Sequence, residues 1–123
     1  MLPSLFVSLL TLGSLANAQA QVKIMALGDS ITGSPGCWRA LLYRKLQPLS
    51  LPTKFVGTLP AQGCGFTYDG ANEGHGGILA TNIVSQRQLP GWLSRTTPDI
   101  VMMHLGTNDV WNNRSPTEIL AAY

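Results

Sequence analysis

Two apolar runs place the strongest constraint on how this chain folds. They are VKIMAL, residues 22–27, and DIVMMHL, residues 99–105, and each ends at a glycine, Gly28 or Gly106. An almost unbroken apolar run of this length is typical of a strand that is buried on both faces. Such strands occur in parallel sheets that carry helices on each side, so the two runs predict an α/β fold.

The segments between and after these runs alternate between strand and helix patterns. Ser115, Pro116 and Glu118 form a capping box with proline at the first helical position, which predicts that a helix starts there. The alternation predicts a three-layer α/β/α sandwich of the flavodoxin-like kind with a parallel sheet. Three strands are few for this architecture, so we expect the domain to be incomplete at its carboxyl end. The predicted elements are strands at 22–27, 53–57 and 99–105, and helices at 37–47, at 78–86, around Trp92 and Leu93, and from Ser115 onward.

The first 20 residues are predicted to be a secretory signal peptide. Their apolar stretch, residues 5–15, is too short to span a bilayer, and small residues in the A-x-A pattern follow it. The alternative is a buried helix of the fold, which would need a partner because the stretch is apolar all round. We therefore expect a secreted, extracellular protein whose mature part spans residues 21–123 and does not insert into a membrane.

The charge of the chain points to no particular partner. The formal net charge is +2, and the eight Lys and Arg residues are scattered along the sequence. Without a basic stripe that could follow a phosphate backbone, nucleic acid binding is not expected.

The two cysteines, Cys37 and Cys64, are expected to form a disulfide, because secretion places them in an oxidising compartment. On the chain-entropy estimate this bond would stabilise the fold by about 3 to 4 kcal/mol. Two buried free thiols are the alternative. A zinc site is less favoured, since the cysteines lack the C-x-x-C spacing and no pair of histidines lies nearby.

Three polar blocks carry the functional signal. GDSIT (28–32) follows the first strand, NEGHGG (72–77) lies in a glycine-rich loop, and GTND (106–109) follows the last strand. In this order and on these elements the blocks resemble the SGNH hydrolase superfamily, the GDSL-type esterases. The G-x-S-x-G motif of α/β-hydrolases is not met, because Thr32 stands at its closing position. We therefore expect residues 21–123 to be the N-terminal part of an SGNH hydrolase domain.

The sequence around these blocks is most similar to that of secreted fungal members of carbohydrate esterase family three, which remove acetyl groups from xylan. The similarity extends over Val22 to Tyr123. It implies a carboxylic ester hydrolase that acts on acetylated polysaccharide or oligosaccharide, with no metal and no cofactor.

The same resemblance assigns roles to three residues. Ser30 would be the nucleophile, and the backbone N–H groups of Ser30 and Gly77 with the side-chain amide of Asn108 would form the oxyanion hole. Fixed donors around a tetrahedral oxyanion stabilise it by about 3 to 4 kcal/mol each. Glycine allows its N–H a close approach to substrate, and an asparagine amide donates without charge. Asp29 is expected to bond to loop backbone. A turn serine and a turn asparagine are the alternatives for Ser30 and Asn108.

The sequence does not offer an evident general base. In the family this histidine lies in a D-x-x-H segment, and the 123 residues contain none. Of the two histidines, His104 lies in an apolar run and is expected to be a core residue with a hydrogen-bond partner, and His75 is a weak candidate for the base. We therefore expect the chain to be inactive alone. The alternative function is a secreted carbohydrate-binding pseudoenzyme that keeps the cleft and lacks turnover.

Overall fold

The computed structural model describes residues 20–34 and 37–123. The predicted signal peptide lies outside the described residues except for Ala20. Within the described ranges, the helices are all too short or too polar to cross a membrane.

A parallel sheet of four strands forms the centre of the molecule, and β1 (Val22–Gly28) pairs with each of the other three. Its partners are β2 (Thr53–Val56), β3 (Glu73–Gly74) and β4 (Ile100–His104). β4 pairs with residues 24–28 of β1. Because a strand has two edges, β2 and β3 share the other edge, β2 along the first half of β1 and β3 at its end.

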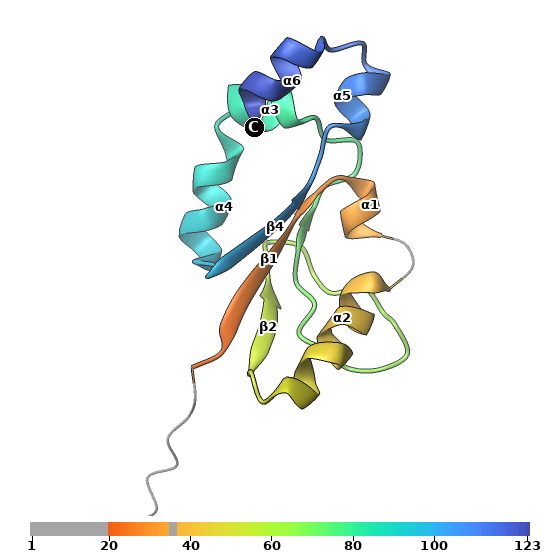
Figure 1. Ribbon diagram of the computed structural model, residues 1–123, viewed down its shortest axis with the longest axis vertical. Helices are drawn as coiled ribbons and strands as arrows, with labels where there is room; N and C mark the ends of the chain where they lie inside the picture. The colour runs from red at the N-terminus through yellow and green to blue at the C-terminus, as the bar shows by residue number, and fades with distance from the viewer. Residues whose placement is uncertain (1–19, 35–36) are drawn as a thin grey trace, which may run out of the picture.

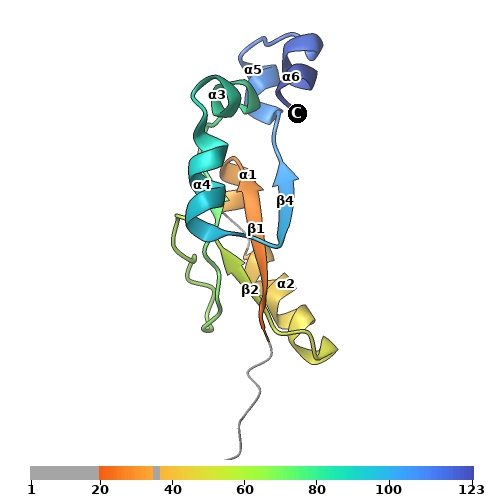
Figure 2. The ribbon, with the colours of Figure 1, turned by 90° about the vertical axis from the view of Figure 1, so that its left-hand side faces the viewer.

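Helices cover both faces of the sheet, so the expected α/β architecture with a parallel sheet is confirmed (Figures 1 and 2). On one face, α2 (Trp38–Leu46) packs on Ile24, Ala26 and Phe55. On the other, α3 (Ala80–Ser85) and α4 (Gln88–Thr96) contribute Ile83 and Trp92 to a core with Met25 and Leu27. Alternate residues of β1 thus enter opposite cores, as the period of a strand requires.

The remaining elements are short. The predicted capping box is confirmed: the Ser115 hydroxyl accepts from the Glu118 N–H at 3.2 Å, and the Glu118 carboxylate accepts from the Ser115 N–H at 2.8 Å. Two helices of four and five residues follow the carboxyl ends of β1 and β4, and they position the candidate site. The short elements are α1 (Ser30–Gly33), η1 (Gln47–Leu49), α5 (Thr107–Trp111) and α6 (Pro116–Ala122).

The expectation that the last strand is buried was wrong. All five residues of β4 are exposed, and its four apolar side chains, residues 100–103, keep between 37% and 48% of their surface accessible. His104 is likewise exposed rather than a core histidine. The reason is that β4 pairs on one edge only among the described residues, and the helices leave its apolar side chains partly uncovered.

The expected disulfide between Cys37 and Cys64 is confirmed, with a Cα–Cα distance of 5.7 Å. It joins the residue that precedes α2 to the loop between β2 and β3. The loop is long and carries little regular structure, so a covalent link to a packed helix restricts it.

Candidate functional site

Ser30 is the first residue of α1, just beyond the carboxyl end of the central strand. Asp29 precedes it and caps the helix, because its carboxylate accepts a hydrogen bond from the Ile31 N–H at 2.9 Å. We expected Asp29 to bond to loop backbone; it does bond to backbone, but to that of a helix. The N–H of a first helical residue has no acceptor within its own helix, and that of Ser30 has none elsewhere in the described ranges. Ser30 therefore presents an exposed hydroxyl and a free N–H.

A buried arginine holds the other end of this short helix. The Arg39 guanidinium donates from Nη1 to the carbonyl oxygens of Thr32 and Gly33, the latter at 3.1 Å, and the residue is only 2% exposed. Burial lowers the pKa of Arg39 from its usual value. Since cations favour the carboxyl end of a helix, where carbonyl groups lack partners, the arginine stabilises α1 in place.

Gly77 lies in a tight turn that directly follows β3. The Ile78 N–H donates to the His75 carbonyl oxygen at 3.2 Å, which closes the turn over residues 75–78. Gly77 has a φ of +74°, the conformation that a type II turn requires at its third residue. Within the described part of the chain, no protein acceptor binds the Gly77 N–H. The turn therefore offers a second free backbone donor.

Asn108 connects this turn to the segment that contains Ser30. Its Nδ2 atom lies 3.0 Å from the carbonyl oxygen of Ile78 and 3.4 Å from Oδ2 of Asp29. The same amide therefore reaches the residue before Ser30 and the residue after Gly77. The three sequence blocks meet at the carboxyl ends of β1, β3 and β4, where open α/β sheets bind their ligands.

Asp109, next to Asn108, is fully buried and fixes α5 against the start of α3. Its carboxylate accepts from the Ala80 N–H at 2.7 Å, the Thr81 N–H at 3.1 Å and the Thr81 hydroxyl at 2.7 Å. Burial alone would raise the pKa of Asp109, but the hydrogen bonds from Thr81 and Ala80 outweigh it and lower the pKa. The side chain thus caps α3 from a different helix.

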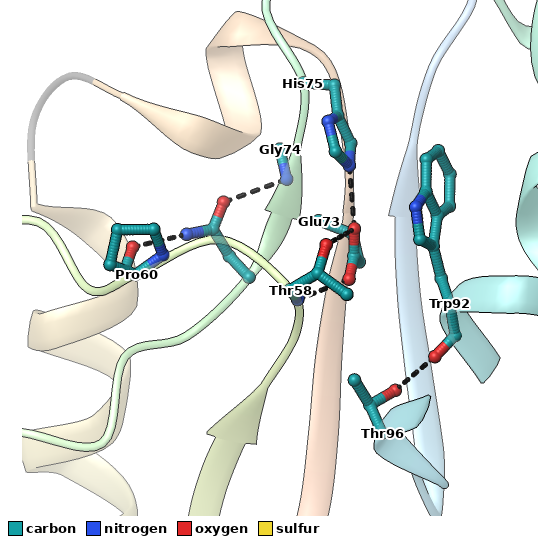
Figure 3. A network of polar contacts seen from close by, with 8 residues as sticks. Thr58, Pro60, Glu73, Gly74, His75, Trp92 and Thr96 are labelled. Carbon is teal, nitrogen blue, oxygen red and sulfur yellow. Dashed lines mark hydrogen bonds and ion pairs between the residues drawn. The ribbon is translucent and has the colours of Figure 1, made fainter. Parts of the chain in front are cut away.

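His75 and Glu73 form a hydrogen-bonded pair beside the turn (Figure 3). Nε2 of His75 lies 2.7 Å from Oε2 of Glu73, whose side chain is fully buried. The imidazole also stacks on the Trp92 indole, with ring centroids 4.5 Å apart and 12° between the planes. Nε2 is therefore engaged by a carboxylate rather than free to accept a proton from Ser30.

No group of three or more His, Cys, Asp or Glu side chains that could hold a metal ion occurs among the residues described. An apolar cavity of about 320 Å³ lies between β4, α3, α4 and the end of the chain, lined by residues such as Ile83, Leu89, Met103 and Tyr123. Neither Ser30, Gly77 nor Asn108 lines it.

Sequence reasoning placed Ser30, Gly77 and Asn108 in one site but missed the residues that support them. Arg39 gave no signal, because a single charged residue in a helix is usually solvated. Asp109 closes the GTND block, but the motif did not show that its carboxylate caps a different helix. The Glu73–His75 contact did have a signal in the sequence. Residues two apart in an extended segment project to the same side, so the two side chains could have been expected to lie close together. Trp92 was expected to be helical, and nothing in its pattern linked it to His75.

Known proteins resemble this chain in sequence and in structure, although no protein-family model matches it. A multidomain esterase of Ruminococcus flavefaciens is 30% identical over an alignment of 120 positions, which covers 80% of this chain and 16% of that protein. A family 3 carbohydrate esterase of Talaromyces cellulolyticus is 36% identical with a TM-score of 0.74, over 84% of this chain and 52% of that one.

Two further structures agree. A serine-to-alanine mutant of an acetyl esterase, solved with an acetate ion, is 35% identical with a TM-score of 0.74 over 84% of this chain and 52% of that one. A family 3 esterase of Clostridium thermocellum is 32% identical with a TM-score of 0.72, over 84% of this chain and 53% of that one. The expected resemblance to carbohydrate esterase family 3 is confirmed. The chain spans about half the length of these solved relatives.

Proposed function

We propose that this relative of the family 3 carbohydrate esterases provides the nucleophile and oxyanion hole of a secreted serine esterase. Its substrate would be an acetylated plant cell-wall polysaccharide of the acetylxylan kind. The observation that carries the proposal is the placement of Asn108, whose amide lies 3.4 Å from Asp29 Oδ2 and 3.0 Å from Ile78 O. Asp29 directly precedes Ser30, and Ile78 directly follows Gly77, so the expected nucleophile and the expected donors share one small region.

The chemistry is acyl transfer. Ser30 Oγ attacks the acetyl carbonyl carbon while its proton passes to a base, and the carbonyl oxygen becomes an oxyanion. The free N–H groups of Ser30 and Gly77 are suited to bind that oxygen. The sugar hydroxyl leaves with the proton from the base, and water then releases acetate from the acetylated serine.

Asn108 would supply the third donor, which requires a small rearrangement. Its amide currently donates to Ile78 and Asp29, so one N–H would have to turn toward the oxyanion. The longer of the two contacts, to Asp29, is the one we expect to be exchanged when substrate binds. The bond to Ile78 would then keep the turn in place.

In our proposal, the general base is the histidine of a D-x-x-H segment that lies outside these 123 residues. Nε2 of His75 is bound to Glu73, and His104 is an exposed residue of β4. Neither imidazole has a hydrogen bond to Ser30 Oγ among the described residues, so neither completes a triad. Members of a triad act as a unit, and losing one costs nearly as much as losing all. We therefore expect residues 21–123 alone to be inactive.

Secretion is supported by two features. The predicted leader over residues 1–20 has the pattern of a cleaved signal peptide, and the Cys37–Cys64 disulfide suits an oxidising compartment. N-terminal sequencing of the protein recovered from culture medium should give a first residue near Gln21. An intact leader on a cell-associated protein would contradict secretion.

The experiment that tests the function compares two polypeptides. The first is residues 21–123, and the second follows the reading frame past Tyr123 to the end of the gene. We expect the second to contain a D-x-x-H segment and to release acetate from acetylxylan, and we expect its Ser30→Ala variant to be inactive. The first should hydrolyse p-nitrophenyl acetate no faster than its own Ser30→Ala variant.

Two outcomes would overturn parts of the proposal, the external base in the first case and the catalytic function in the second. Ser30-dependent turnover by residues 21–123 would show that one of the two histidines serves as the base. A stop codon directly after Tyr123, together with binding of acetylated xylan and no turnover, would support the non-catalytic carbohydrate-binding alternative.

A further inference from the structure

The turn over residues 75–78 needs an anchor that its own backbone does not provide. Gly76 and Gly77 are its central residues, and a Cβ at either position would meet no described atom within 4 Å apart from those of its chain neighbours. Glycine has the largest backbone freedom to lose, and empty surroundings do not restrict it. The direction of the Gly77 N–H is therefore set by the residues at the two ends of the turn. Ile78 at one end is held by Asn108, 3.0 Å away.

At the other end, the backbone of His75 is already part of the sheet. Its N–H donates to the Gly28 carbonyl oxygen at 2.9 Å, and its own carbonyl oxygen accepts from Ile78 at 3.2 Å. A rotation of the His75 backbone would tilt the plane of the turn relative to Gly28, two residues before Ser30. The side chain of His75 is thus attached at the point from which the turn pivots.

Glu73 gives this side chain a rigid acceptor. The carboxylate is fully buried and accepts from the Thr58 N–H at 2.5 Å and the Thr58 hydroxyl at 2.9 Å. Both bonds tie β3 to the segment after β2, and they do not involve the histidine. The bond to His75 Nε2 at 2.7 Å is a separate contact that fixes the edge of the imidazole (Figure 3).

Trp92 fixes the face of the same ring. Its indole lies nearly parallel to the imidazole, at 4.5 Å between centroids. Trp92 is a residue of α4, is 9% exposed and packs in the core. It therefore does not move independently of the domain. An aromatic stack and a charge-assisted bond to a buried carboxylate leave the His75 side chain one orientation.

We propose that His75, held by Glu73 and Trp92, is a positioning residue that aims the Gly77 N–H at the oxyanion. The inference rests on the proposed esterase function. A purely structural alternative, in which the pair ties β3 to its neighbours, is already served by the two Thr58 bonds. What His75 adds acts on the turn itself.

The kinetic test uses the polypeptide that includes the D-x-x-H segment. An oxyanion donor acts mainly in the transition state, so misaiming it lowers kcat and leaves substrate binding unchanged. We expect His75→Ala to lower kcat by about tenfold to a hundredfold with KM within about twofold, since the donor is loosened rather than removed. A loss of the same size in kcat/KM that comes from KM alone would contradict the proposal, and so would a folded variant with unchanged kcat.

Conservative variants separate the two contacts. His75→Gln can still donate to Glu73 but cannot stack, and Trp92→Phe keeps an aromatic face; each should retain more kcat than His75→Ala. Thr96→Val is the matched control on α4, because it removes only the hydroxyl that donates to the Trp92 carbonyl oxygen. It should leave kcat unchanged. A loss in Thr96→Val as large as in His75→Ala would mean that α4 is generally sensitive.

A second measurement does not depend on turnover. Acetate, the product of deacetylation, is added to the 123-residue protein while the amide resonances of Ser30 and Gly77 are followed by NMR. We expect both to shift saturably, and His75→Ala to weaken the Gly77 response at least severalfold while the Ser30 response remains. Equal responses in the variant would overturn the role of His75 alone. Absence of any response in the unaltered protein, with no Ser30-dependent turnover, would remove the esterase function and the inference together.

Discussion

The side-chain amide of Asn108 donates a hydrogen bond to the carbonyl oxygen of Ile78, 3.0 Å away, and so holds the turn that carries Gly77. One side chain therefore has two tasks in the proposed site, donating to the oxyanion and keeping a second donor in position. The prediction for this residue follows from that double task.

Asn108→Ala in the polypeptide with the D-x-x-H segment should lower turnover on acetylated substrate by about a hundredfold or more, because loss of one oxyanion donor alone has that effect. Circular dichroism and thermal unfolding should show that the variant remains folded. A folded and fully active variant would remove Asn108 from the site. Asn112→Ala is a suitable control, since among the described residues its side-chain amide donates to the backbone of Asn108 and to no other group.

Asp109→Ala should lower the free energy of unfolding by about 2 to 3 kcal/mol, because it leaves the buried Ala80 N–H and the partly buried N–H and hydroxyl of Thr81 without their acceptor. Urea denaturation at neutral pH measures this loss. Ser94→Ala, on the exposed side of α4, should change stability little. A loss for Asp109→Ala no larger than for this control would show that the cap of α3 is not an important contact.

The same carboxylate makes stability depend on pH. The pKa of Asp109 is lowered in the folded protein from its ordinary value of 3.8, so folding favours the ionised form. Its contribution is present above pH 3.8 and is lost as the pH falls through the lower, folded-state value. Asp109→Asn should therefore unfold with a shallower pH dependence below about pH 4 than the unaltered protein. Acid titrations of both proteins, followed by tryptophan fluorescence, would test this, and coincident curves would contradict it.

Removing the disulfide by a double substitution, Cys37→Ser with Cys64→Ser, should destabilise the fold by about 3 to 4 kcal/mol on the chain-entropy estimate. The bond joins residues 27 apart in sequence. Reducing agent should lower the melting temperature of the unaltered protein to near that of the double variant and leave the variant unaffected. A melting temperature that does not respond to reduction would show that the bond contributes little.

Arg39→Met should lower the unfolding free energy by about 2 kcal/mol, because the Gly33 carbonyl oxygen loses its donor and the Thr32 carbonyl oxygen keeps only the Trp38 indole N–H, 3.2 Å away. Arg39→Lys restores a cation and one donor group and should recover part of the loss. Urea denaturation of the unaltered protein, Arg39→Lys and Arg39→Met would measure the three unfolding free energies, which should decrease in that order. Equal stability of Arg39→Met and the unaltered protein would mean that burial of the cation offsets its bonds.

The main strands and the pairing of the cysteines could be predicted because their signals are local or leave few choices. VKIMAL is apolar without interruption, and only two cysteines are present. By contrast, β3 has two residues, Glu73 and Gly74, and α1 has four, which is too short for any periodicity to develop. The exposure of β4 was missed for a different reason. An apolar run predicts that a strand is buried, but it does not show which other elements would cover it.

The candidate site shows the same division. Ser30, Gly77 and Asn108 were found through short motifs whose order along the chain is informative. Arg39, Glu73 and Trp92 support that site through contacts between elements distant in sequence, and such contacts depend on the packing of the whole sheet. Of these, only the E-x-H spacing of Glu73 and His75 could have been read from the sequence.

The arrangement of the sheet around β1 bears on the order of folding. Every other strand pairs with β1, and the Lys23 N–H reaches Asp99 Oδ2 across 76 residues of sequence. Contacts between residues so distant in sequence form slowly, and a nascent chain makes β1 long before β4. β1 therefore has one edge open until β4 has been synthesised. A chaperone that binds extended apolar segments should accordingly associate with VKIMAL on stalled chains from which β4 has not emerged, and release it from longer chains in which β4 has left the ribosome.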